Sequence, residues 1–266
     1  MRRDRPAAPV RILHLGLGGF FRSHHAWYTH RAPDADRWGI AAFSRRSGDL
    51  AARLAAQDGL YTLLTRAPDR DRFEVIGSLV DAHPGGDHGA WLDHWRRPEL
   101  AVVTLTVTEA GYTRLPGGGL DTDLPDVRAD IAALRADPGA ATVTAAGRLL
   151  SGLAVRRRAG GGPVAIVSCD NLPDNGRVIA RVIAELAEEA GVPVPEVSCV
   201  TTMVDRITPY PTEEDVAAVA AATGRSDAAP VVAEPFSEWV LCGEFPAGRP
   251  AWQEVGCAFR RGYDAV

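Results

Sequence analysis

Residues 10–32 read VRILHLGLGGFFRSHHAWYTHRA. The apolar run VRILHL predicts a strand, and a glycine-rich turn connects it to a helix through HHAWYTHRA. In dinucleotide-binding folds the first glycine of such a turn makes the tight bend. The second lets backbone amides approach a pyrophosphate at the helix N-terminus. We predict these roles for Gly16 and Gly18. The neighbours expected in the same phosphate site are Gly19, Phe20 and Arg22.

The glycine-rich turn also has a purely structural explanation. Any strand-to-helix turn can use glycine for its geometry, so the turn taken alone supports both explanations equally. The third position of the usual fingerprint is Phe21 here, where a glycine is expected. We therefore predict a looser contact between the helix and the strand than in a standard dinucleotide-binding turn.

Strand-like and helix-like segments alternate along the rest of the chain. Strands are predicted at residues 10–15, 39–44, 100–107, 163–169 and 195–200, and further helices at 48–57, 125–136, 176–190 and 211–224. Continuous apolar strands separated by helices are typical of a parallel sheet covered on both faces. We predict an α/β fold with a doubly wound, mostly parallel Rossmann-type sheet.

Two stretches depart from this alternation. Residues 61–66 and 72–80 follow each other without a helix between them, which predicts an antiparallel hairpin added to the main sheet. Residues 231–242 are compatible with either a strand or a helix.

The bulk composition favours a small-molecule partner. A net charge of −5 and a pI near 5.8 give no basic footprint for nucleic acid, and no apolar stretch is long enough to cross a bilayer. The four cysteines show no CxxC spacing and the seven histidines no HxxxH spacing, so we assign no metal. We predict a cytoplasmic protein without nucleic-acid or membrane partners.

The segment after the second predicted strand bears on cofactor choice. A dinucleotide-binding fold usually carries an acid there for the ribose hydroxyls. This chain has Arg45 and Arg46, which could accept a 2′-phosphate, and then Asp49, which could reach a ribose. Solvated surface charges are an equally good explanation, so the residues alone leave NAD and NADP open.

Several strings, taken in order, resemble the mannitol dehydrogenase family, also called the polyol-specific long-chain dehydrogenases. The opening string is similar to the family's GxGxFHRxH, with Phe21 in place of the usual histidine. The other strings are QDGLYTLLTR (57–66), LTVTEAGY (105–112), SCDNLPDNG (168–176), TMVDRITP (202–209), EPFSEWVL (234–241) and GRPAWQEVG (248–256).

The resemblance implies an NAD(P)-dependent oxidoreductase that acts on the CH–OH group of a polyol or hexonate, of the mannitol/fructose or mannonate/fructuronate type. It implies that residues 1–266 form one NAD(P)-binding Rossmann-type domain, with NAD the first expectation and NADP the alternative. TMVDRI together with VVAEPF looks somewhat closer to the fructuronate reductase branch.

The resemblance also implies roles for two residues. Asn171 would donate to the substrate oxygen, and Asp205 would be an acidic residue beside the site. Simpler alternatives are a turn residue for Asn171 and a surface ion pair between Asp205 and Arg206. Thr108 and Glu109 end a predicted strand and could line the nicotinamide side of the cleft, or Thr108 could cap the next helix.

The catalytic base is the part of the family pattern that this sequence lacks. In the family the base is a lysine in a K-x-x-x-x-N-x-x-H motif that follows the segment resembled by GRPAWQEVG. All 29 basic residues here are arginine, which is a poor general base. The resemblance therefore implies a dinucleotide-binding portion without the family's C-terminal helical domain, inactive unless a separate helical domain completes it. The alternative is a non-catalytic dinucleotide-binding module.

Overall fold

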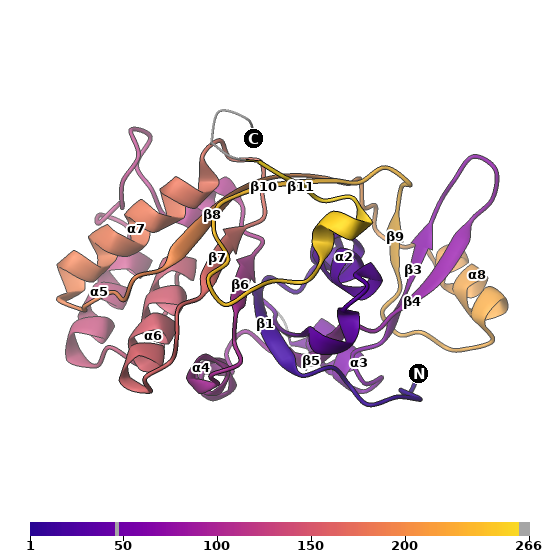
Figure 1. Ribbon diagram of the computed structural model, residues 1–266, viewed down its shortest axis with the longest axis horizontal. Helices are drawn as coiled ribbons and strands as arrows, with labels where there is room; N and C mark the ends of the chain where they lie inside the picture. Colours follow the sequence, from indigo (N-terminus) through magenta and orange to yellow (C-terminus); the bar gives the residue numbers. More distant parts are fainter. Residues whose placement is uncertain (46–47, 261–266) are drawn as a thin grey trace. The chain divides into compact units, whose positions relative to one another are not determined.

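The computed structural model describes residues 1–45 and 48–260, which fall into two compact units (Figure 1). The first unit comprises residues 1–86, 204–239 and 249–258. The described part of the second comprises residues 87–203, 240–248 and 259–260. The fold is a mostly parallel, Rossmann-type α/β fold with an additional small sheet, as predicted.

Three parallel strands form the centre of the first unit, in the order β1-β2-β5. They are β1 (Val10–Leu15), β2 (Gly39–Phe43) and β5 (Leu79–His83). Every residue of β2 is buried, which explains its continuously apolar sequence GIAAF. The helical segments that follow β1 and β2 are α1 (Gly19–Ser23), α2 (His25–Arg31), η1 (Ala35–Arg37) and α3 (Asp49–Ala55).

The predicted hairpin is present, but it does not join the parallel sheet. Strands β3 (Tyr61–Thr65) and β4 (Arg72–Ile76) pair antiparallel, and β9 (Val231–Ala233) adds to β3 in parallel. The prediction of one strand over 72–80 was wrong. Strand β4 ends at Ile76, and after two residues outside any strand the chain forms β5, which pairs with β2. Between these two strands, the Ser78 hydroxyl donates to the Ala26 carbonyl, a contact that the local sequence does not reveal.

Helix α8 (Glu213–Thr223) packs on this small sheet. Its Val219 is buried against Leu64 and Val232. Thr212 caps the helix and forms a capping box with Asp215, as its TEED sequence suggests. Residues 231–242, ambiguous in the sequence, form β9 and β10 (Glu238–Cys242) rather than a helix.

The second unit contains the parallel strands β6 (Val102–Leu105), β7 (Ala165–Ser168) and β8 (Ser198–Asp205), although β8 ends in the first unit. Strand β8 starts three residues later and ends five residues later than predicted. The predicted helices are α5 (Pro125–Ala136) and α7 (Asn175–Ala190). The other helical elements of this unit are α4 (His88–Arg96), η2 (Glu109–Tyr112) and α6 (Ala145–Arg158). Near the C-terminus, η3 (Trp252–Val255) belongs to the first unit and is followed by β11 (Ala258–Phe259).

Helix α6 was not predicted, and its two glycines explain why. Glycine lowers helix propensity by about 1 kcal/mol relative to alanine. A Cβ at Gly152 would lie 2.2 Å from the Trp95 ring, so this glycine permits close packing of α6 on α4. A Cβ at Gly147 would lie 2.3 Å from a carboxylate oxygen of Asp130. Tertiary packing thus selects residues that weaken the local helix signal.

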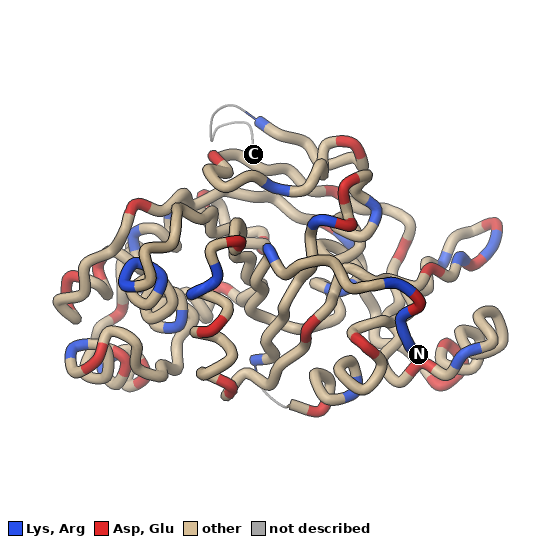
Figure 2. Tube along the Cα trace, turned by 60° about the horizontal axis from the view of Figure 1, so that its bottom comes forward, with Lys and Arg blue, Asp and Glu red and all other residues tan. Residues whose placement is uncertain are grey.

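Within the part of the chain that the structure describes, no helix combines the length and apolar character needed to cross a membrane. Acidic and basic residues are interspersed along both units (Figure 2).

Candidate functional site

The glycine turn follows β1 and is tied to the end of β2. The amides of Gly16 and Leu17 both donate to the Phe43 carbonyl, at 2.9 and 3.1 Å. Gly16 has a φ of +122°, a conformation that side chains disfavour. Glycine is therefore required at position 16 by the fold itself.

Gly18 differs, because the fold does not require its lack of a side chain. Its φ of −125° is open to any residue, and a Cβ there would meet only the Gly16 carbonyl oxygen, at 3.8 Å. By contrast, a Cβ at Gly19 would lie 3.3 Å from the Thr208 methyl group. The open space beside Gly18 is what a pyrophosphate needs to approach the backbone, so this turn fits a dinucleotide.

The helix after the turn is interrupted, unlike the single helix predicted. Helix α1 ends at Ser23, and α2 begins after His24, whose backbone leaves the helical region. Phe21 is fully buried and stacks on His14, with ring centroids 3.8 Å apart. The ring fills the interval between helix and strand that a glycine would have closed.

Three histidines are buried at this junction. Burial lowers the pKa of His14 and of His24 to about 3. Burial also lowers the pKa of His25 well below its usual value, and the neighbouring His24 and His14 lower it further. Neither ring nitrogen of His25 has a hydrogen-bond partner among the described residues. Its ring meets the edge of Trp239 at a centroid distance of 5.0 Å. These histidines are neutral packing groups in the folded protein.

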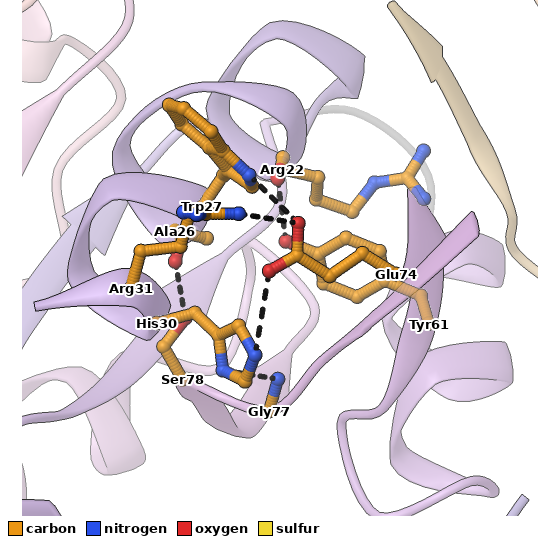
Figure 3. A network of polar contacts seen from close by, with 9 residues as sticks. All are labelled: Arg22, Ala26, Trp27, His30, Arg31, Tyr61, Glu74, Gly77 and Ser78. Carbon is orange, nitrogen blue, oxygen red and sulfur yellow. Dashed lines mark hydrogen bonds and ion pairs between the residues drawn. The ribbon is translucent and has the colours of Figure 1, made fainter. Parts of the chain in front are cut away.

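A polar network fixes α2 to the hairpin (Figure 3). One carboxylate oxygen of Glu74, on β4, accepts from the Trp27 indole at 3.0 Å and pairs with Arg31 at 3.4 Å. The other oxygen lies 3.9 Å from His30. The Tyr61 hydroxyl donates to the Arg22 carbonyl at 2.6 Å. The small sheet thus positions the helices that follow the glycine turn, a role that the sequence did not reveal.

Arg22 and Arg206 are buried, and backbone carbonyls accept from their guanidinium groups. Arg22 donates to the carbonyls of Gly18, Ala229 and Pro230. Arg206 donates to the carbonyls of Ser23 and Glu234, and its guanidinium lies 4.5 Å over the Trp27 ring. Arg206 therefore holds the end of α1 through its bond to Ser23, a structural role that differs from the surface ion pair with Asp205 considered from the sequence. Asp205 itself is exposed at the end of β8.

The ribose candidates lie after β2. Arg45 is exposed immediately beyond this strand, and Asp49 is the exposed first residue of α3. Arg46, the second candidate for a 2′-phosphate, lies outside the described residues.

In the second unit, two of the quoted strings meet at one sheet edge. Leu105 and Ser168 are register partners at the carboxyl ends of β6 and β7, so the residues that follow both strands share this edge. Open α/β sheets bind ligands at that edge. The predicted residues that follow these strands are all exposed: Thr108, Glu109 and Asn171. Thr108 occupies the N-cap position of η2 without a capping side-chain bond, and Glu109 pairs with Arg114 at 2.6 Å.

A second network, missed in the sequence, supports this edge. The Tyr112 hydroxyl donates to the Asp170 carboxylate, and burial, followed by the Asp170 charge, raises the Tyr112 pKa. Asn175 is fully buried; its amide donates to the carbonyls of Asp170 and Thr202 at 3.0 and 3.1 Å and accepts from the Thr202 amide at 2.9 Å. Asn175 had the same turn-like sequence signal as Asn171. Its burial and these hydrogen bonds distinguish it from the exposed Asn171.

Comparison with known proteins decides the family. The model of the mannitol dehydrogenase Rossmann domain matches residues 10–254. The chain belongs to the mannitol dehydrogenase family. Among curated relatives, D-arabinitol 4-dehydrogenase of Ralstonia nicotianae is 40% identical over 96% of this chain and 56% of its own length. D-mannonate oxidoreductase of Escherichia coli is 35% identical over 96% of this chain and 54% of its own length. These identities do not single out the fructuronate reductase branch.

A solved mannitol dehydrogenase shares the fold. The ternary complex of Pseudomonas fluorescens mannitol 2-dehydrogenase with NAD and D-mannitol is 35% identical, with a TM-score of 0.85 over 96% of this chain and 54% of that chain. The chain thus spans about half the length of the mannitol dehydrogenase relatives that it matches.

Proposed function

We propose that this chain is the NAD(P)-binding portion of an oxidoreductase that acts on the CH–OH group of a polyol or hexonate. The observation that carries the proposal is the open approach to Gly18 in a chain whose family is established. NAD is the cofactor we expect first, because a structural neighbour is an NAD complex, and NADP is the alternative.

The chain's own residues divide the work. The nicotinamide, when bound, would accept or supply the hydride. The turn from Gly16 to Gly18 would hold the pyrophosphate, with Arg45 or Asp49 toward the ribose and Thr108 and Glu109 toward the nicotinamide. The Asn171 amide would donate to the substrate oxygen as charge develops on it. Asp205 would supply a carboxylate beside the substrate.

Oxidation of the alcohol requires a base that accepts the hydroxyl proton. In the family this base is a lysine, and this sequence contains no lysine. Arginine stays protonated at neutral pH and cannot replace it. We therefore propose that turnover requires a lysine-bearing segment in addition to these 266 residues.

Dinucleotide binding is tested with a matched pair of glycine variants. Isothermal titration with NADH should show binding to the chain and its loss in Gly18→Val, since the new side chain fills the pyrophosphate approach. Gly162→Val is the control, because Gly162 lies before β7 and a Cβ there meets nothing within 4 Å. A chain that binds neither NAD(H) nor NADP(H) at millimolar concentration would refute the proposal.

Turnover is tested by complementation. The 266-residue chain alone should not oxidise mannitol, arabinitol or mannonate above background. Adding the separately expressed C-terminal portion of a relative should restore activity, and Asn171→Ala should then lower kcat by about 10²- to 10³-fold. Dinucleotide binding without activity in any such mixture would favour the non-catalytic module.

A further inference from the structure

A cavity of about 810 Å³ opens beside the glycine turn, within the first unit. Its walls are residues 18–20 of the turn, Leu50 and Arg53 of α3, and the segments 208–211 and 227–231. This volume suits a nucleotide-sized ligand. Leu50 and Arg53 were not among the positions that the sequence suggested for cofactor binding. The sequence suggested only Asp49 of α3, and neither Asp49 nor Arg45 is among the residues that line this cavity.

The cavity is locally cationic in a chain whose charges are otherwise interspersed (Figure 2). Three arginines line it, namely Arg22, Arg53 and Arg206, against a single carboxylate, Asp227. That carboxylate is already engaged, because it accepts from the Gln57 side chain and from the amides of Thr62 and Ala229. It therefore offers little further hydrogen bonding to the arginines.

Arg22 is the buried source of this charge. Only 6% of the residue is exposed, and its partners through Nε and Nη1 are neutral carbonyls. Among residues 1–45 and 48–260, Nη2 has no hydrogen-bond partner, although it is not an enclosed atom. Figure 3 shows the guanidinium pointing away from Glu74. The Asp227 charge offsets part of the cost of burying Arg22, but none of the described carboxylates accepts a hydrogen bond from its guanidinium. An anion in the cavity would therefore stabilise Arg22 further. Burial also lowers the Arg22 pKa, which means that its neighbours do not fully offset the loss of hydration of its charge.

Arg53 supplies a second charge near solvent. Its Nη1 donates to the Ala228 carbonyl at 3.0 Å, which directs the exposed side chain along the cavity wall. Nε and Nη2 have no partner within the described part of the chain. A guanidinium with unused donors matches the geometry of phosphate oxygens.

We propose that this cavity binds the phosphate groups of the dinucleotide, with Arg53 and the Nη2 edge of Arg22 as ligands in addition to the glycine turn. This inference rests on the proposed dinucleotide-binding function. It adds Arg53 to Asp49, the residue of α3 that the sequence suggested for cofactor binding.

The experiment titrates the full chain with inorganic pyrophosphate and, separately, with NAD. Pyrophosphate should bind and compete with NAD, and Arg53→Gln should weaken both ligands by about tenfold, the effect of losing one charge-assisted interaction. Arg53→Lys, which keeps the charge, should retain part of the affinity. Arg70→Gln is the control, because it removes an equally exposed arginine from the β3–β4 turn of the same unit.

The outcomes separate this inference from the proposed function. If NAD binds and Gly18→Val abolishes binding, while Arg53→Gln leaves both affinities unchanged, the phosphate cavity is refuted and the function stands. If pyrophosphate binding depends on Arg53 but no dinucleotide binds, the anion site stands and the function fails. Equal losses in the Arg53 and Arg70 variants would show only an effect of net charge, and would also refute the site.

Discussion

Mild acid should destabilise this protein through His14, His24 and His25. Their pKa values are lowered in the folded state by burial, whereas in the unfolded chain each histidine titrates near 6.5. The unfolded state therefore binds protons first as the pH falls. The stability that depends on neutral histidines is fully present above pH 6.5 and is lost progressively towards pH 3.

The size of the effect follows from linkage. Between pH 7 and pH 5, each histidine whose folded pKa is near 3 costs roughly 2 kcal/mol of unfolding free energy. His14 and His24 together thus cost about 4 kcal/mol, and the lowered pKa of His25 adds to this loss. Domains are typically stable by about 5–15 kcal/mol, so the fold should become marginal near pH 5. Most carboxylates titrate below this window and contribute little to the change.

Urea unfolding at pH 7, 6 and 5, followed by tryptophan fluorescence, measures this loss. His25→Phe should make the stability depend less steeply on pH and raise the stability at pH 5 above that of the wild type, since neither His25 ring nitrogen has a partner to lose. His88→Gln, which replaces the half-buried first residue of α4, is the control for a histidine substitution outside this junction. A wild-type loss below about 1 kcal/mol between pH 7 and pH 5, or an unchanged slope in His25→Phe, would refute the reasoning.

Three further predictions concern packing, a buried amide and cofactor choice. Gly152→Ala places a Cβ 2.2 Å from Trp95 and should cost about 1–3 kcal/mol, seen as a lower urea midpoint; an unchanged midpoint would show that α4 and α6 can separate without cost. Asn175→Ala leaves buried backbone groups at Asp170 and Thr202 without partners and should cost about 1–3 kcal/mol by the same assay, whereas the exposed Asn171→Ala should cost under about 0.5 kcal/mol. Arg45→Gln should weaken NADP(H) more than NAD(H) in calorimetric titrations, because only a 2′-phosphate uses its charge; equal effects would show that Arg45 faces solvent alone.

The sequence by itself determined the elements whose signals are local. The run from Val10 to the glycine turn predicted a strand and a bend, and the φ of Gly16 confirms that the bend needs glycine. The pattern over residues 211–224 predicted α8, and the alternation of strands and helices predicted the parallel fold. These features depend on neighbours a few residues apart, which the sequence displays directly.

Other features were decided only by tertiary structure, because their causes lie far apart in the chain. The hairpin forms a small sheet with β9, in which Leu63 pairs with Val231, and does not extend the sheet that contains β1, β2 and β5. Helix α6 contains Gly152, and the reason for a glycine there is the Trp95 ring, which packs where a Cβ would lie. Arg22 was expected at a phosphate because it follows the turn, but the carbonyls that orient its guanidinium come from Ala229 and Pro230. A local pattern specifies which residue is present, whereas its partners, its burial and hence its electrostatic role arise when distant segments meet.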